Sequence, residues 1–172
     1  MFSNYPPEVA RFLESQSVNL DDCVNTQYTV PRAKTVLPIK KFALDIFRTQ
    51  IEPFYQDRGI NAQFAVYNLL SETLKNAVFH SQSDAAIQAN LMVSPSALLF
   101  DINDGGEYFT RPDIKSHWEA KEKHPQRHEA GVKGVGYNRG TIHIYGFSDL
   151  IFVQNSTATL YLGVTVPSKY VH

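Results

Sequence analysis

Cysteine and long apolar runs are both scarce in this chain of 172 residues. Cys23 is the only cysteine, so no disulfide can form within the chain, and we expect a reducing, cytoplasmic setting. The longest apolar runs, such as Ala97 to Phe100, are far shorter than the roughly 20 residues that a membrane span needs. No basic segment followed by an apolar stretch opens the chain. These absences predict a soluble cytoplasmic protein with no membrane partner.

An excess of charge of one sign is also lacking. Lysine and arginine together number 16, against 17 for aspartate and glutamate, and no run of like charge occurs. Binding to a phosphate backbone requires such a basic surface, so we expect no nucleic-acid partner. Because 43% of the residues are hydrophobic and 19% are charged, the chain has the composition of a globular protein. We expect a short arm over residues 1–25 and one domain over residues 26–172.

Two common glycine-rich phosphate motifs are missing as well. No Gly-x-Gly-x-x-Gly follows a first strand, and no Gly-x4-Gly-Lys-Ser/Thr occurs anywhere. The sequence therefore excludes the Rossmann dinucleotide fold and the P-loop nucleotide-binding fold.

The segment from Asn61 to His80 has the clearest helical periodicity in the chain. Its apolar residues recur at steps of three and four and form one stripe, made of Val66, Leu70, Leu74, Ala77 and Val78. Asn68, Glu72, Asn76 and His80 follow one another at four-residue steps on the opposite side. The spacing alone is equally typical of an amphipathic helix with a solvated polar face. A carboxylate and an amide one turn apart can also share a ligand, which makes Glu72 and Asn76 candidates for a site.

The remaining elements are predicted from strand and turn patterns. Val9 to Leu13 predicts a short amphipathic helix in a loosely attached arm, which is a candidate homodimer contact. Gly59 and Asn61 are expected to supply a chain break and a helix N-cap. The other expected elements are an edge strand at Thr26 to Val30, a long helix at Ala33 to Gln56 that is kinked or frayed at its ends, a hairpin of Ile87 to Val93 with Ala97 to Asn103, and two final strands at Asp149 to Gln154 and Thr157 to Val166.

Two glycine-containing segments are further candidates for a binding site. Asp104 ends a strand and is followed by Gly105 and Gly106, so its carboxylate can accept a hydrogen bond from an amine of a flat ligand. A plain Asp-Gly turn explains the same pattern. Gly131, Gly134 and Gly136 close a long polar segment, and backbone amides at such glycines suit an oligophosphate. A flexible hinge is the alternative explanation for this cluster.

Taken in order, these segments resemble the GHKL ATPases, whose Bergerat fold occurs in histidine kinases, anti-sigma-factor serine kinases, gyrase-type ATPases and Hsp90 chaperones. The resemblance runs from about Thr26 to Pro167. Glu72-x-x-x-Asn76-Ala77-x-x-His80 is similar to the N box of the family, Asp104-x-Gly106 to its first glycine box, and Gly131, Gly134 and Gly136 to its second. Thr159 is similar to a threonine that supports the adenine-binding aspartate.

The resemblance implies ATP and Mg²⁺ as cofactors and gives these residues their roles. Glu72 would activate the nucleophile, Asn76 would bind magnesium, and His80 would end the N box beside the nucleotide. Asp104 would read the adenine amino group, and the glycines would contact the phosphates. Glu107 to Lys133 would form the lid over ATP. The implied fold is a two-layer α/β sandwich, with a mixed, largely antiparallel sheet and both long helices on one face.

Two features favour the anti-sigma-factor kinases within this family. Tyr108 replaces the second glycine of the first box, a departure that anti-sigma-type members often share. The helix before the N box contains no histidine, which excludes autophosphorylation there. We expect a regulatory serine/threonine kinase whose partner is a sigma factor or an anti-anti-sigma-like protein. A nucleotide-gated interaction module with little turnover and an ATPase subunit of a larger complex remain as alternatives.

Overall fold

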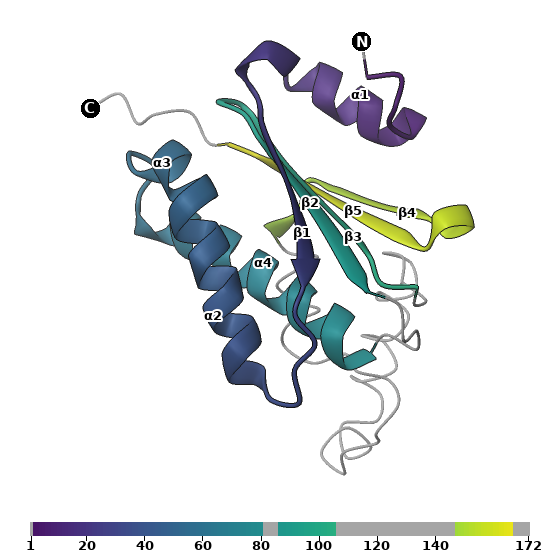
Figure 1. Ribbon diagram of the computed structural model, residues 1–172. Coiled ribbons are helices and arrows are strands. Elements are labelled where there is room, and N and C mark those ends of the chain that lie inside the picture. The colour runs from purple at the N-terminus through teal and green to yellow at the C-terminus, as the bar shows by residue number, and fades with distance from the viewer. Residues whose placement is uncertain (1, 81–85, 106–146, 167–172) are drawn as a thin grey trace, which may run out of the picture.

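The computed structural model describes residues 2–80, 86–105 and 147–166. Its helices and strands follow one another in the order α1 (Pro7–Ser15), η1 (Leu20–Asp22), β1 (Val24–Val30), α2 (Val36–Ile46), η2 (Phe47–Ile51), α3 (Glu52–Tyr55), α4 (Ile60–His80), β2 (Ile87–Val93), β3 (Ala97–Asn103), β4 (Leu150–Gln154), η3 (Asn155–Thr157) and β5 (Thr159–Thr165). The described elements form an α+β fold in which helices pack on a single sheet (Figure 1).

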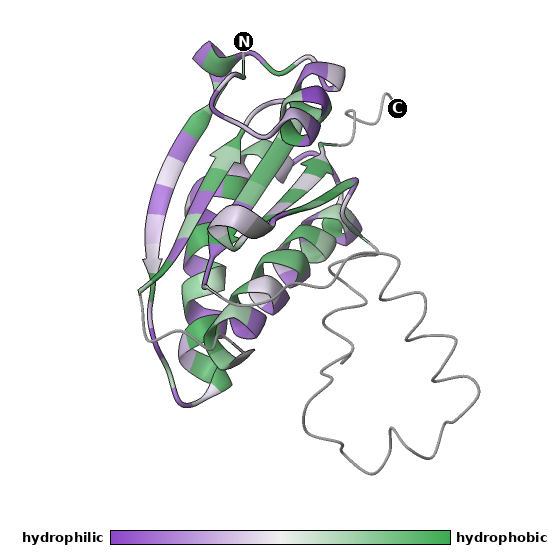
Figure 2. Ribbon diagram, turned by 90° about the vertical axis from the view of Figure 1, so that its right-hand side faces the viewer, coloured by the Kyte–Doolittle hydropathy of each residue, from purple (hydrophilic) through white to green (hydrophobic). Residues whose placement is uncertain are grey.

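The sheet has five strands in the order β1-β2-β3-β5-β4, and each neighbouring pair is antiparallel. The prediction of a largely antiparallel sheet is therefore confirmed, and its expected parallel component does not occur among the described strands. The edge position predicted for the first strand is also confirmed. Figure 2 shows this strand, β1, as mostly hydrophilic or pale, in keeping with its largely exposed side chains.

The central hairpin of β2 and β3 matches its predicted bounds at both strands. Ser94 closes its turn, because the Ser94 hydroxyl donates to the carbonyl of Ala97 and accepts from the Ala97 amide, both at 2.9 Å. The Ser94 amide also donates to the Ala97 carbonyl at 2.9 Å, so three hydrogen bonds join the two ends of this turn. The hairpin places Asn90 directly opposite Asp101.

The main core lies between the sheet and the two long helical segments. Helices α2 and α4 pack against each other and cover one face of the sheet (Figure 1). The strands contribute alternate apolar side chains to this face, among them Leu91, Phe100 and Leu162. The predicted stripe of α4 meets them, with Leu74 fully buried. We call this side of the sheet the helix face.

The first helical segment loses its regular α-helical pattern just before Pro53. The chain continues from α2 through the π-helical η2 into α3, so the prediction of a long helix of limited regularity is confirmed, although it begins at Val36 and not at Ala33. Pro53 has no N–H to donate to the carbonyl four residues earlier, and the Glu52 amide donates instead to Phe47, five residues earlier. The π turn therefore absorbs the proline without ending the helix.

Helix α4 begins one residue before its predicted start. Gly59 has a φ of +83° and its carbonyl accepts the first helical bond, from the amide of Gln63. Gly59 therefore occupies the cap position, and the predicted capping role of Asn61 is wrong. Among the described residues, no helix is both long enough and apolar enough to cross a membrane.

The N-terminal arm packs on the opposite side of the sheet, which we call the α1 face. The predicted helix is confirmed as α1, but its expected loose attachment is wrong, because Val9 and Leu13 are fully buried. They pack in a second, smaller core with Met92 and Leu99 of the central hairpin. Figure 1 shows α1 and the α2 and α4 helices on opposite sides of the strands. The two predicted layers therefore have a partial third.

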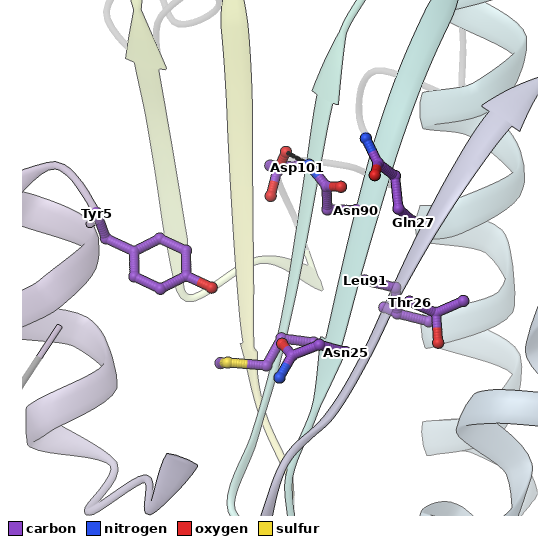
Figure 3. A pocket seen from close by; sticks show the side chains of 8 residues that line it. Tyr5, Asn25, Thr26, Gln27, Asn90, Leu91 and Asp101 are labelled. Atoms are coloured by element: carbon purple, nitrogen blue, oxygen red, sulfur yellow. Dashed lines mark hydrogen bonds between the residues drawn. The ribbon is translucent and has the colours of Figure 1, made fainter.

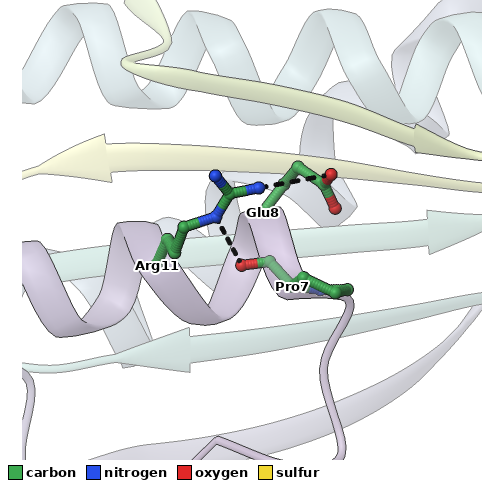
Figure 4. Close-up of polar contacts among 3 residues, drawn as sticks. All are labelled: Pro7, Glu8 and Arg11. Atoms are coloured by element: carbon green, nitrogen blue, oxygen red, sulfur yellow. Dashed lines mark hydrogen bonds and ion pairs between the residues drawn. The ribbon is translucent and has the colours of Figure 1, made fainter.

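On the outer side of α1, the polar contacts of Arg11 with other described residues are local. Arg11 donates through Nε to the carbonyl of Pro7 at 3.3 Å and through Nη2 to the carboxylate of Glu8 at 3.4 Å (Figure 4). Exposed ion pairs of this kind contribute little to stability. The buried side of α1, rather than this pair, therefore holds the arm on the sheet.

Candidate functional site

Helix α4 carries polar side chains on the side away from its buried stripe, as the sequence predicts. Asn68, Glu72 and Asn76 are each partly buried, with the protein covering much of their surface. A fully solvated polar face would leave these side chains exposed. The arrangement therefore favours a sheltered row of one carboxylate and two amides, which are groups able to contact a ligand or a cation.

The carboxylate of Glu72 is paired with a residue that sequence analysis did not identify. Lys75 Nζ lies 2.5 Å from Glu72 Oε1, and the two side chains are only 19% and 16% exposed. Such a sheltered pair interacts more strongly than one in open water. The spacing of three residues on one helix was the signal available for Lys75. Glu72 therefore has a positive charge beside it.

Asp104 occupies the position after the last residue of β3 and is buried, at 6% exposure. The chain then turns at Gly105, whose φ of +71° lies in the region that favours glycine. The predicted strand-to-turn transition is confirmed at this point. A buried carboxylate at the end of a central strand is costly to keep without a functional or structural reason.

Thr159 begins β5 and is paired in register with Asn103, the residue before Asp104. Its hydroxyl lies 2.9 Å from the hydroxyl of Thr157 and accepts from Asn103 Nδ2 at 3.5 Å. Asn103 Nδ2 also donates to the Thr157 carbonyl at 2.8 Å. These bonds tie the end of β3 to the start of β5, so Thr159 helps to fix the backbone from which Asp104 extends.

The chain connection limits how far apart the two halves of the candidate site can lie. Helix α4 ends at His80 and β2 begins seven residues later, at Ile87. Gln88 pairs with Asn103 across the hairpin. Seven residues span at most about 25 Å, so the end of α4 lies within that reach of the start of β2, beside the end of β3. Figure 1 shows the last turns of α4 and the end of β3 toward the same end of the molecule.

Several predicted site residues lie outside the described part of the chain. These are Gly106, Gly131, Gly134 and Gly136, together with the proposed lid from Glu107 to Lys133. His80 is the last residue of α4, as predicted from the helical periodicity. The described part of the site therefore consists of Glu72, Asn76, Asp104 and Thr159.

Within residues 2–80, 86–105 and 147–166, no three histidine, cysteine, aspartate or glutamate side chains gather as a protein-only metal site would require. A cation held by Asn76 together with phosphate oxygens needs no such cluster, so the magnesium role of Asn76 stays a prediction. No model of a known protein family matches the chain, and no curated protein matches its sequence.

Proposed function

We propose that this chain binds Mg-ATP in the manner of the GHKL ATPases and acts in the cytoplasm as a regulatory serine/threonine kinase of the anti-sigma-factor type. One observation carries the proposal: the buried carboxylate of Asp104 ends a central strand, while Glu72 and Asn76 are sheltered on the helix that covers the same sheet. The antiparallel sheet with two long helices on one face supports it. A Bergerat fold would place the nucleotide between α4 and the end of β3.

Each described residue has a part in this proposal that suits its chemistry. Asp104 is a buried acceptor, which matches the amino group of adenine and not the carbonyl of guanine. Glu72 is the general base for the hydroxyl of a partner protein. Asn76 offers the oxygen ligand that magnesium prefers. When bound, magnesium would neutralise charge on the phosphates.

The pairing of Glu72 with Lys75 adds a condition to the kinase mechanism. The Lys75 ammonium contacts Oε1 of Glu72, so this oxygen is open to a partner hydroxyl only after Lys75 moves. The phosphates of a bound nucleotide would attract Lys75 away. The same pairing favours a second candidate, a nucleotide-gated interaction module in which ATP breaks the pair without turnover.

Thermal unfolding with nucleotides tests the binding proposal. ATP and ADP with magnesium should raise the melting temperature of the full chain, and GTP should raise it much less. Asp104→Asn should remove most of this preference. Asp101→Asn is a matched control, because it removes a carboxylate from the same region of the chain but on the α1 face. If no adenine nucleotide stabilises the wild type at millimolar concentration, the binding proposal is wrong.

Phosphoryl transfer to candidate partner proteins separates the kinase from the gated module. A general base contributes roughly 10²- to 10⁴-fold, so Glu72→Gln should reduce turnover by about that factor and leave ATP affinity nearly unchanged. Asn76→Ala should weaken both affinity and turnover, because magnesium bridges the phosphates. Tight ATP binding with equal turnover in wild type and Glu72→Gln would support the gated module instead.

A further inference from the structure

A polar cavity lies on the α1 face, on the opposite side of the sheet from α4. Its volume is about 320 Å³. The side chains that line it come from the arm, β1, β2 and β3, and include Tyr5, Asn25, Gln27, Asn90, Met92 and Asp101. Figure 3 shows Tyr5 across the cavity from the strands, with its hydroxyl directed toward them. Nothing in the proposed nucleotide site uses this cavity.

The strand register places polar side chains in one row across this part of the sheet. Gln27 pairs with Asn90, Asn90 with Asp101, and Asp101 with Tyr161. Because residues paired in register point to the same face, four neighbouring strands each contribute one polar group to the row. The sequence indicates one member of this row, because Asp101 lies between the apolar Phe100 and Ile102 and therefore points to the opposite face of the sheet.

Of the described side chains that line the cavity, Asp101 alone is charged. Asn90 Nδ2 donates to Asp101 Oδ1 at 2.7 Å (Figure 3). Among the described residues, no lysine, arginine or histidine forms an ion pair with Asp101. Burial raises the pKa of Asp101 to about 6, and the hydrogen bond from Asn90 opposes that rise only in part. The carboxylate is thus partly dehydrated and has no counter-ion in the part of the chain that the structure describes.

We propose that this cavity binds an organic cation, an ammonium or guanidinium group, with Asp101 as its counter-ion. A cation supplies the missing charge, and its N–H groups match the oxygens of Asp101, Asn90 and Gln27. The ring of Tyr5 and the thioether of Met92 offer an apolar and polarisable wall for an alkyl stem. A neutral polyol would leave the carboxylate uncompensated, so the charge of Asp101 decides between the two ligand classes.

The position of Tyr5 links this site to the N-terminal arm. Tyr5 precedes α1 and lines the cavity opposite the sheet. Burial and the nearby Asp101 both raise the pKa of the Tyr5 hydroxyl, so the two groups interact electrostatically. The Tyr5 hydroxyl therefore stays protonated at neutral pH, and a cation that contacts both the Tyr5 ring and Asp101 would hold the arm more firmly on the sheet.

The experiment titrates the full chain with n-butylammonium chloride at pH 7.5 and follows the Asn90 side-chain amide by NMR. Saturable shifts of this amide are expected, and 1-butanol, which has the same alkyl stem without charge, should cause none. Asp101→Asn should weaken binding at least tenfold. Asp45→Asn is the matched control, because it removes an exposed carboxylate on α2 and should leave binding unchanged.

Two further measurements identify the source of the cation and the role of charge. Gly-Lys-Gly binding more tightly than n-butylammonium would assign the site to a basic side chain of a partner, and the reverse would assign it to a free amine. Both Gly-Lys-Gly and n-butylammonium should bind less well at pH 5 than at pH 7.5, because Asp101 takes up a proton as the pH falls. Tyr5 from the arm, Tyr161 from β5 and Cys23 before β1 all have raised pKa values, so none of them titrates in that range.

Three results would overturn the proposal. The first is equal binding of 1-butanol and n-butylammonium by the wild type, a comparison that does not depend on any variant folding. The second is unchanged binding by Asp101→Asn. The third is the appearance of the same shifts of the Asn90 amide when magnesium or calcium chloride is added without an amine, which would make this a metal site. Failure of nucleotide binding would leave all three comparisons intact, because the two sites lie on opposite faces of the sheet.

Discussion

The two faces of the sheet differ in how completely they are covered. On the helix face, β2, β3 and β5 each direct a continuous row of apolar side chains toward α2 and α4. On the α1 face, the short arm helix covers only one part of the strands, around Leu99, and the neighbouring part carries the polar row that includes Asn90 and Asp101. The helix face therefore carries the larger apolar core, and the α1 face carries a smaller core with a polar cavity at its edge.

The comparison has an energetic consequence. Buried apolar area stabilises a fold in rough proportion to its size, so the helix face should contribute most of the free energy of folding. Helix α1 has nine residues and buries three of them. Its attachment is therefore the weaker of the two, and the cavity at its margin can open at a lower cost than the main core.

The largest predicted difference between the faces concerns two fully buried leucines. Leu74 lies at the centre of the helix face, and Leu13 lies in α1. We expect Leu74→Ala to lower the free energy of unfolding by about 3 to 5 kcal/mol and Leu13→Ala by about 2 to 3 kcal/mol, because the smaller core can relax around the lost side chain. Urea denaturation followed by circular dichroism measures both values.

Leu37→Ala controls for the loss of helix-forming leucine side chains in general. Leu37 is 76% exposed on α2, and its replacement should change stability by no more than about 0.5 kcal/mol. A cost for Leu13→Ala that equals or exceeds that of Leu74→Ala would contradict the ranking of the two faces.

Gly163 offers a more specific way to disturb the α1 face. A Cβ at this position of β5 would lie 2.6 Å from Phe12 Cε1 and 2.9 Å from Leu150 Cβ. Gly163→Ala should therefore push Phe12 out of its place and cost about 1 to 3 kcal/mol in thermal or urea unfolding. The helix face should keep its packing, as judged by unchanged protection of α4 amides from hydrogen exchange.

A double-mutant cycle separates this collision from a general effect of alanine in a strand. Phe12→Leu removes the ring atoms that a new Cβ would meet, so the double variant should lose less stability than the two single variants predict by addition. Strict additivity would show that α1 does not rest on Gly163.

The accuracy of sequence analysis differs between local and distant contacts. The hairpin of β2 and β3 was predicted at its exact bounds because Ser94, Pro95 and Ser96 interrupt two runs of strand-forming residues. The stripe of α4 was predicted because five apolar residues follow helical steps. Each of these signals lies within about twenty residues of sequence, so periodicity and turn chemistry are sufficient to read it.

Contacts between distant segments left no such signal. The apolar stripe of α1 predicts that this helix packs on another part of the protein. That surface includes Gly163, about 150 residues away, and a glycine gives no sequence signal that a helix packs against it. The spacing of Lys75 fits both a solvated side chain and an ion pair with Glu72, and only the structure shows the ion pair. The Asp101 row requires the register of four strands, of which the sequence predicts one hairpin.

The smallest predicted effect concerns the ionisation of Asp101 on the α1 face. Burial raises the pKa of Asp101 from 3.8 to about 6 in the folded chain. Between about pH 4 and 6 the folded state therefore holds a proton that the unfolded state has released, and stability falls as the pH rises through this window. At pH 7.5 the ionised carboxylate costs about 1 to 3 kcal/mol relative to its protonated form.

Asp101→Asn should remove this cost, because a neutral amide keeps the shape of the side chain and can still accept the hydrogen bond from Asn90. We expect the variant to be more stable than the wild type by about 1 to 2 kcal/mol at pH 7.5 and nearly equal to it at pH 4. Urea denaturation at a series of pH values measures the difference. Asp45→Asn, which removes an exposed carboxylate on α2, is the matched control. If the two variants follow the same pH dependence, Asp101 is well hydrated in solution, and the α1 face then lacks the dehydrated carboxylate that distinguishes it from an ordinary solvated sheet surface.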